Sequence, residues 1–149
     1  MKALRRLIAG IHIFVGIGAL GGGLAALGNP AAPLGMSLDA LKNGPFIDFF
    51  VPGLFLFLVI GLGNIVTAWV VLKKASYHGL ASGVMGSIMV VWIVIQCWIM
   101  QSVIFLQALY FFIGAVQGFL ALLLLYKEDE FPVDIARRWL ETRGGRSRR

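Results

Sequence analysis

The feature that most constrains this chain is an uncharged stretch of 52 residues, which runs from Ala75 to Tyr126 without Asp, Glu, Lys or Arg. A helix needs about 20 apolar residues to cross the roughly 30 Å hydrocarbon layer of a bilayer. The stretch therefore predicts two membrane spans joined by a turn, over residues 79–100 and 103–126. Two further uncharged runs predict spans over residues 7–28 and 51–72.

The composition leaves no room for a separate soluble domain. Of the 149 residues, 59% are hydrophobic and only 13% are charged, and four spans of about 20 residues use most of the chain. We therefore expect an all-α, polytopic membrane protein with a four-helix transmembrane domain over 1–126 and a basic tail over 127–149. Cys97 is the one cysteine, which excludes an intramolecular disulfide and any Cys-x-x-Cys redox or zinc motif.

The basic residues gather on one side of the membrane when the spans alternate in direction. Three precede the first span, two follow the second and seven follow the fourth, and only Lys42 lies on the other side. The positive-inside rule then predicts that both termini lie in the cytoplasm and that the protein is multi-pass in the cytoplasmic membrane. The placement of the charges, rather than their net value of +6, carries the information. It predicts lipid and not nucleic acid as a partner.

The N-terminus also has the features of a secretory signal peptide, with a basic start, an apolar core and the small residues Ala25 and Ala26. Cleavage there would leave three spans with unchanged topology. The uncharged run is much longer than the 7–15 residues or so of a signal core, and the polar His12 lies inside it. We therefore expect the first span to be retained.

Two short helices are predicted outside the spans. In the outer segment, residues 29–50, Ser37 is placed to cap a helix over Leu38–Lys42. In the tail, Asp134 is placed to cap an amphipathic helix from Ile135 to about Thr142. The arginines on and after this helix predict contact with anionic lipids of the inner leaflet: Arg137, Arg138, Arg143, Arg146, Arg148 and Arg149.

Small residues form one stripe on each predicted span. Such stripes let helix backbones approach closely, which is how helices associate in lipid. The predicted packing positions are Gly16, Gly23, Gly79, Gly83, Gly114 and Gly118. Four stripes predict a compact bundle. They also favour an accessory or scaffold protein that packs against a second copy or a larger membrane complex.

One polar residue of each span falls at a similar depth. At 1.5 Å per residue, His12, Asn64, Ser87 and Gln117 lie about 8–13 Å inside the inner edge of the bilayer. Gln117 lies about 80° from the small-residue face of its span, which argues against its joining this layer. The plainer interpretation is that these side chains hydrogen-bond one another and fix the helix register. The alternative is a polar site in which His12 titrates or binds a ligand, as in a small transporter or a lipid- or small-molecule-binding protein.

A second polar group surrounds the predicted outer turn and comprises Asp48, Gln96 and Gln107. It would form the floor of an outward-facing pocket, or it reflects the ordinary polarity of a turn at the headgroup level. The second interpretation is favoured because no nucleophile and base accompany these amides. No phosphate loop, metal-binding helix motif or nucleophile elbow occurs. We predict no catalytic residue, metal or cofactor, and a cofactor-dependent enzyme using His12 ranks third among the classes of function.

A further pattern combines several residues of the last three spans: Pro52-Gly53-Leu54-Phe55-Leu56-Phe57, Gly61, Asn64, Trp92, Gln96, Leu106, Gln107, Tyr110, Phe111 and Gly114. This pattern resembles a group of small bacterial four-span membrane proteins that lack an assigned activity, and the similarity extends over about residues 46–125. The resemblance implies a prokaryotic plasma membrane and a four-helix bundle. It supplies no catalytic residues.

Overall fold

The computed structural model describes residues 2–128, which form helices and short connections. Four helical segments are long and apolar enough to cross a membrane: Lys2–Gly28, Phe50–Lys73, His78–Met100 and Phe105–Lys127. The prediction of an all-α bundle of four spans is therefore confirmed. The predicted helix of the tail and its six arginines lie outside the described residues.

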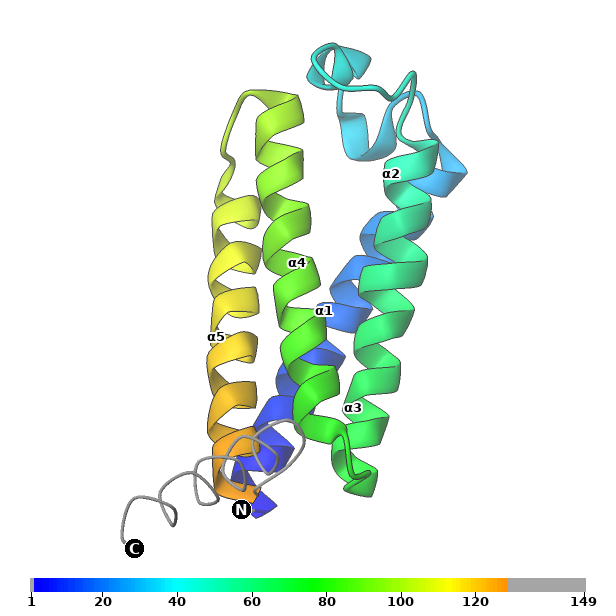
Figure 1. Ribbon diagram of the computed structural model, residues 1–149. Coiled ribbons are helices and arrows are strands. Elements are labelled where there is room, and N and C mark those ends of the chain that lie inside the picture. The colour runs from blue at the N-terminus through cyan, green and yellow to red at the C-terminus, as the bar shows by residue number, and fades with distance from the viewer. Residues whose placement is uncertain (1, 129–149) are drawn as a thin grey trace, which may run out of the picture.

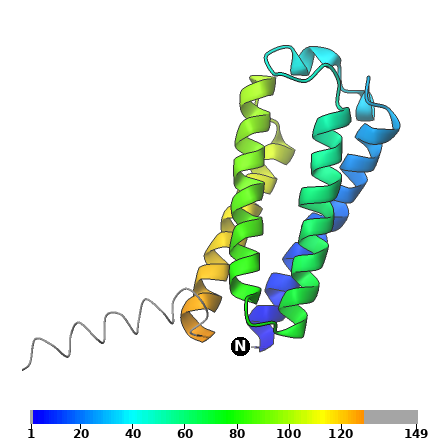
Figure 2. The ribbon, with the colours of Figure 1, turned by 45° about the vertical axis from the view of Figure 1, so that its right-hand side comes forward.

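The spans alternate in direction and form two neighbouring pairs (Figure 1). The elements in chain order are α1 (Lys2–Gly28), η1 (Pro33–Gly35), η2 (Leu38–Leu41), α2 (Phe50–Phe55), η3 (Leu56–Leu62), α3 (Gly63–Lys73), α4 (His78–Met100) and α5 (Phe105–Glu128). One pair is α1 with the second span, which runs from α2 through η3 to α3, and the other pair is the α4–α5 hairpin. We call the end that carries residues 29–49 the loop end. The opposite end, where α1 begins and α5 ends, is the terminal end (Figures 1 and 2).

Large apolar side chains cover the outside of the bundle along its length. Those exposed at mid-height include Phe14, Ile17, Leu58, Val66, Val91, Phe112 and Phe119. An exposed apolar surface of this extent is unfavourable in water and suits the hydrocarbon region of a bilayer. The surface agrees with the hydropathy of the four segments in indicating a multi-pass membrane protein.

Glycines on α1 and on the second span allow these two helices to touch. A Cβ atom added at Gly23 would lie 2.7 Å from Phe57 Cβ, and one at Gly16 would lie 2.6 Å from Ile65 Cδ1. Gly53 is equally close to Ala26. The stripe predicted on the first span is therefore used inside the chain, against its own second span.

The α4–α5 hairpin has its closest contact at Gly86. A Cβ atom there would lie 2.8 Å from the backbone nitrogen of Gly118 and 2.9 Å from the carbonyl oxygen of Gly114. Gly114 packs against Val90 and Met89, and Gly83 makes an ordinary contact with Ala121. Gly79 is buried in the first turn of α4. Gly118, which is also a predicted packing position, makes the contact with Gly86 through its backbone nitrogen, whereas a Cβ atom at Gly118 itself would meet nothing within 4 Å. Only its backbone faces α4.

The second span departs from α-helical geometry halfway along its length. Residues Leu56–Leu62 form a π-helix, whose hydrogen bonds reach one residue further along the chain. Gly61 within it faces Leu20 of α1, where a Cβ atom would lie 2.8 Å from Leu20 Cδ2. The wider turn changes the direction in which later residues point. Asn64, in the first turn of α3, follows this change.

The segment between the first two spans folds over the loop end (Figure 2). The Ser37 side chain accepts a hydrogen bond from the backbone of Asp39 at 3.2 Å, which is the predicted capping role. The short helix that follows, Leu38–Leu41, is a 3-10 helix. Leu41, Phe49 and Ile99 pack with Ala26 into a small core that fastens the loop to α1 and α4.

Candidate functional site

Four buried polar side chains meet between the spans, and we call them the polar cluster: His12, Asn64, Ser82 and Gln117, one from each span. His12 Nδ1 lies 2.6 Å from Asn64 Oδ1, and His12 Nε2 lies 2.7 Å from Ser82 Oγ. Gln117 Nε2 lies 3.1 Å from Asn64 Oδ1 and 3.0 Å from His12 Nδ1. All four side chains are 0% exposed. The cluster therefore joins all four spans at one level.

The surroundings of Asn64 decide where the hydrogen atoms lie. Its Nδ2 donates to the carbonyl oxygen of Ile60 at 2.8 Å, so its Oδ1 must face His12 and act as an acceptor. His12 Nδ1 then carries the hydrogen and donates to Asn64 Oδ1. In the neutral imidazole, Nε2 is left to accept from the Ser82 hydroxyl. Gln117 Nε2 also donates to Asn64 Oδ1, while Gln117 Oε1 is buried without a hydrogen-bond partner among the described residues.

The structure brings together three of the four residues of the predicted polar layer, His12, Asn64 and Gln117. The choice of Ser87 needs correction. Its side chain is exposed on the outside of α4 and donates to the carbonyl oxygen of Gly83 at 2.9 Å. Ser82 takes its place because it lies one turn before Gly86 on the buried face of α4, whereas five residues on a helix turn the side chain by about 140°. The four-residue spacing between Ser82 and Gly86 could have identified Ser82 from the sequence, whereas the depth in the membrane could not.

Gln117 joins the cluster although it lies off the small-residue face of α5. The reason is that α5 packs against two helices, α4 and α1. The glycine face of α5 contacts α4, and the side of the helix that carries Gln117 faces the middle of the bundle. Gln117 Cβ would lie 3.1 Å from a Cβ atom at Gly86, which shows how closely α4 approaches it.

The order of groups in the cluster is hydroxyl, imidazole and amide, which is also the order of a nucleophile, a base and the group that orients it. The surroundings do not support catalysis. All four side chains are fully buried, and none of them lines either of the two cavities described below. A reacting molecule would need a place about 3 Å from the hydroxyl. The arrangement suits a set of hydrogen bonds that fixes the register of four helices.

A cavity of about 410 Å³ lies at the loop end of the bundle, and we call it the loop-end pocket. Residues of all four spans line it, and Pro33, Leu34 and Met36 of the loop contribute at its mouth. Ala19, Ile60 and Met89 lie deepest, between four and seven residues from the polar cluster along their helices. Its walls are almost entirely apolar. This volume falls within the range of about 300–1,000 Å³ that is typical of small-molecule sites.

Two of the three residues of the predicted outer polar group, Gln96 and Gln107, line this pocket. Gln107 is buried, and its side-chain oxygen accepts from the backbone of Ile104 at 3.0 Å. Asp48 needs correction as a member of the group. It accepts a hydrogen bond from the backbone of Phe50 at 2.9 Å and so holds the start of α2, away from the pocket lining.

Trp92 is a further residue of the pocket wall that carries a polar group. It lies in the middle of α4, is 7% exposed and stacks on Phe55 with 4.3 Å between ring centroids. Its indole Nε1 is buried without an acceptor among the described residues. A buried Trp N–H usually has a partner. The Tyr110 hydroxyl lies in the same pocket against Gly18, where an added Cβ atom would collide with it.

No protein-family model matches this chain, and no curated protein or solved structure is significantly similar to it. The resemblance to small bacterial four-span proteins therefore stays a prediction. Any function must be argued from the chain's own geometry.

Proposed function

We propose that this protein binds a small amphipathic molecule within the membrane, in the loop-end pocket. The observation that carries the proposal is a cavity of about 410 Å³ with apolar walls and an unmatched buried donor, Trp92 Nε1. An apolar pocket with a few convergent polar groups is the usual form of a small-molecule site. The sequence predicted an outward-facing pocket as the alternative for Gln96 and Gln107, and both residues line this cavity.

The polar groups of the pocket suggest the chemistry of the ligand. Trp92 Nε1 can only donate a hydrogen bond, and the Tyr110 hydroxyl and the Gln96 amide can both donate. These groups lie among apolar side chains such as Ile93 and Leu56. They would recognise a largely apolar molecule that carries one or two acceptor oxygens. The pocket lies at the loop end, so we expect the ligand to enter from the bilayer surface at that end.

The test uses two neighbouring glycines of α1 that face opposite environments. Gly22 lines the pocket, and a Cβ atom there would meet only the flexible end of Leu56, at 3.2 Å. Gly21 is exposed, and a Cβ atom there would meet nothing within 4 Å. Gly22→Leu should fill the pocket, and Gly21→Leu adds the same side chain on the outside.

We expect native mass spectrometry of the detergent-solubilised protein to detect a co-purified small molecule with the wild type and with Gly21→Leu. Gly22→Leu should lose that molecule while retaining its helical circular dichroism. Retention of the same molecule by the folded Gly22→Leu variant would reject the pocket as its site. A wild type that carries no small molecule, and whose Trp fluorescence does not respond to apolar probes with acceptor oxygens, would reject the function itself.

The accessory or scaffold role stays a prediction with less support than before. It depended on glycine faces that contact a second copy or a larger complex. Gly16, Gly23 and Gly114 contact other helices of the same chain. A partner helix in the membrane would therefore contact the apolar outer surface instead of these glycines.

We further propose that the protein lies in the cytoplasmic membrane with both termini inside the cell. The support is the distribution of Lys and Arg, of which only Lys42 lies in the loop between the first two spans. A reporter enzyme that is active only in the cytoplasm, fused after Arg149, should be active. The same reporter inserted in the loop after Lys42 should be inactive, and the reverse pattern would contradict the proposal.

A further inference from the structure

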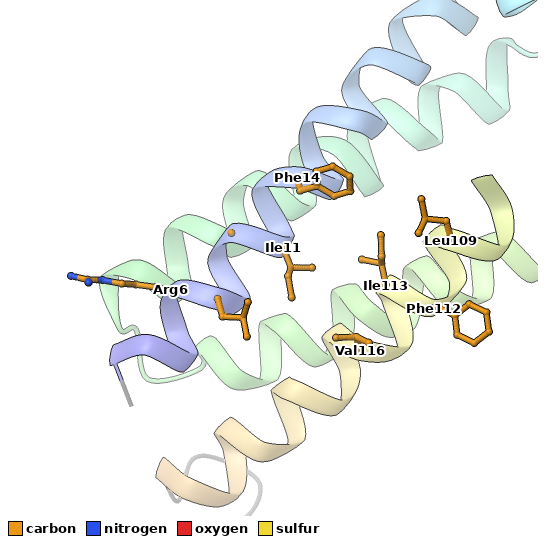
Figure 3. Close-up of a pocket in the computed structure, with 9 residues that line it drawn as sticks. Arg6, Ile11, Phe14, Leu109, Phe112, Ile113 and Val116 are labelled. Carbon is orange, nitrogen blue, oxygen red and sulfur yellow. The ribbon is translucent and has the colours of Figure 1, made fainter. Parts of the chain in front are cut away.

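A second cavity lies on the outside of the bundle between α1 and α5, and we call it the α1–α5 groove (Figure 3). It has a volume of about 490 Å³, and its lining residues among those that the structure describes all belong to these two helices. Ile11 of α1 and Ile113 of α5 extend into the space between the helices (Figure 3). Gly10 lies in the floor, and a Cβ atom there would meet nothing within 4 Å. The groove opens on the apolar outside of the bundle, where Phe14 and Phe112 of its lining are exposed.

One charged residue, Arg6, lines the groove, at the terminal end. Its guanidinium points away from the apolar side chains (Figure 3), and the residue is exposed. Arg6 is only four residues from Lys2, where α1 begins, so it lies about 6 Å from the end of the helix. An arginine in this position keeps its methylene stem on the apolar surface and its charge at the level of the lipid headgroups.

The length of the groove distinguishes between the possible occupants. From Arg6 to Phe14 it extends for eight residues of α1, or about 12 Å. One leaflet of the hydrocarbon layer is about 15 Å deep, which is half of the bilayer core. A partner helix crosses the full hydrocarbon layer of about 30 Å and would extend well beyond the groove. An acyl chain of one leaflet needs only this length, with its headgroup beside Arg6.

We propose that the α1–α5 groove binds one anionic phospholipid, with an acyl chain between Ile11 and Ile113 and the phosphate on Arg6. A basic residue at the end of an apolar slot between membrane helices is the arrangement that recognises an anionic headgroup. The guanidinium can donate two hydrogen bonds to one phosphate. This site is on the outside of the bundle and does not depend on the function proposed for the loop-end pocket.

The experiment titrates the full chain, purified in an uncharged detergent, with phosphatidylglycerol or phosphatidylcholine and measures bound lipid by native mass spectrometry. We expect the wild type to bind phosphatidylglycerol about fivefold more tightly, the size expected for one cation near an anionic lipid. Arg6→Gln should abolish this preference and Arg6→Lys should retain most of it. Lys73→Gln removes an exposed charge at the same end of the bundle and should leave the preference unchanged.

A second pair of variants tests whether the α1–α5 groove holds the acyl chain. Gly10→Phe should fill the groove and weaken the binding of both lipids. Gly21→Phe adds the same ring elsewhere on the exposed face of α1 and is the control. Val116→Trp narrows the groove from α5 at an exposed position and serves if Gly10→Phe does not fold. Equal losses with Arg6→Gln and Lys73→Gln would overturn the proposal. The proposal would also be overturned if a folded groove-filling variant bound lipid as the wild type does. It would be overturned as well if the wild type formed a dimer that this variant dissociates.

Discussion

The polar cluster and the loop-end pocket lie in the same bundle and treat their polar groups in opposite ways. In the cluster, His12 has a hydrogen-bond partner at each ring nitrogen, at 2.6 and 2.7 Å, and it lines neither the loop-end pocket nor the α1–α5 groove. In the pocket, Trp92 Nε1 has no acceptor among the described residues, and about 410 Å³ of space lies next to its ring. The sequence favoured a hydrogen-bonding role for the histidine and left a ligand site as the alternative. The hydrogen bonds of His12 agree with the first interpretation, and we place the proposed ligand site at the loop end.

The difference has a simple physical cause. A buried polar group is costly unless it is hydrogen-bonded. The cluster pairs most of its groups across four helices and leaves Gln117 Oε1 without a partner among the described residues. An unmatched donor beside an open cavity is tolerated when a ligand or water completes it. The number of polar residues in a span is therefore a poor guide to function. A better guide is whether their donors and acceptors are left unpaired and can bind a ligand.

The largest expected effect on stability comes from overpacking the close contact between α4 and α5, beside the polar cluster. Gly86→Leu would drive a side chain into the backbone of α5, where even a Cβ atom lies 2.8 Å from Gly118 N. We expect the free energy of unfolding to fall by about 3 kcal/mol, the upper part of the range for overpacking. Gly118→Leu is the matched control on the facing helix, since nothing lies within 4 Å of its Cβ position. Unfolding in mixed micelles, followed by circular dichroism, measures both.

A smaller effect should follow from removing the centre of the polar cluster. His12→Leu keeps a similar volume and leaves Ser82 and Asn64 without their shared partner. We expect a loss of about 2 kcal/mol, between the roughly 0.6 kcal/mol of one interhelical bond in a membrane and the cost of several unpaired buried groups. The same unfolding assay measures it.

Two outcomes would change this view of the cluster. Ser82→Ala should cost more stability than Ser87→Ala, because only Ser82 contacts His12. Equal effects would contradict the assignment of Ser82 to the cluster. Loss of the pocket ligand in a stable His12→Leu variant would show that the two regions are coupled and that the cluster contributes to ligand binding as well as to helix packing.

The smallest expected effect on stability belongs to the pocket. Trp92→Phe removes the indole N–H and keeps an aromatic ring beside Phe55. Stability should change by less than about 1 kcal/mol, because the lost group has no hydrogen-bond partner among the described residues. The affinity for a ligand with an acceptor oxygen should fall about fivefold, the size of one hydrogen bond. Equal binding of that ligand to both proteins, measured by a fluorescence competition titration, would exclude Trp92 as a contact.

The amino-acid sequence by itself determined the number of spans and their approximate positions, because the length of an apolar segment is a local property that must match the thickness of the bilayer. It also indicated His12, Asn64 and Gln117 as residues of similar depth, and Ser37 as a cap. Only the tertiary structure decided that Ser82, and not Ser87, faces His12, and that Asp48 lies apart from Gln96 and Gln107. These outcomes depend on how far each helix is rotated against its neighbours. Contacts between different helices, such as those at Gly86 and at the π-helical turn, set that rotation, and the hydropathy of a single segment does not contain it.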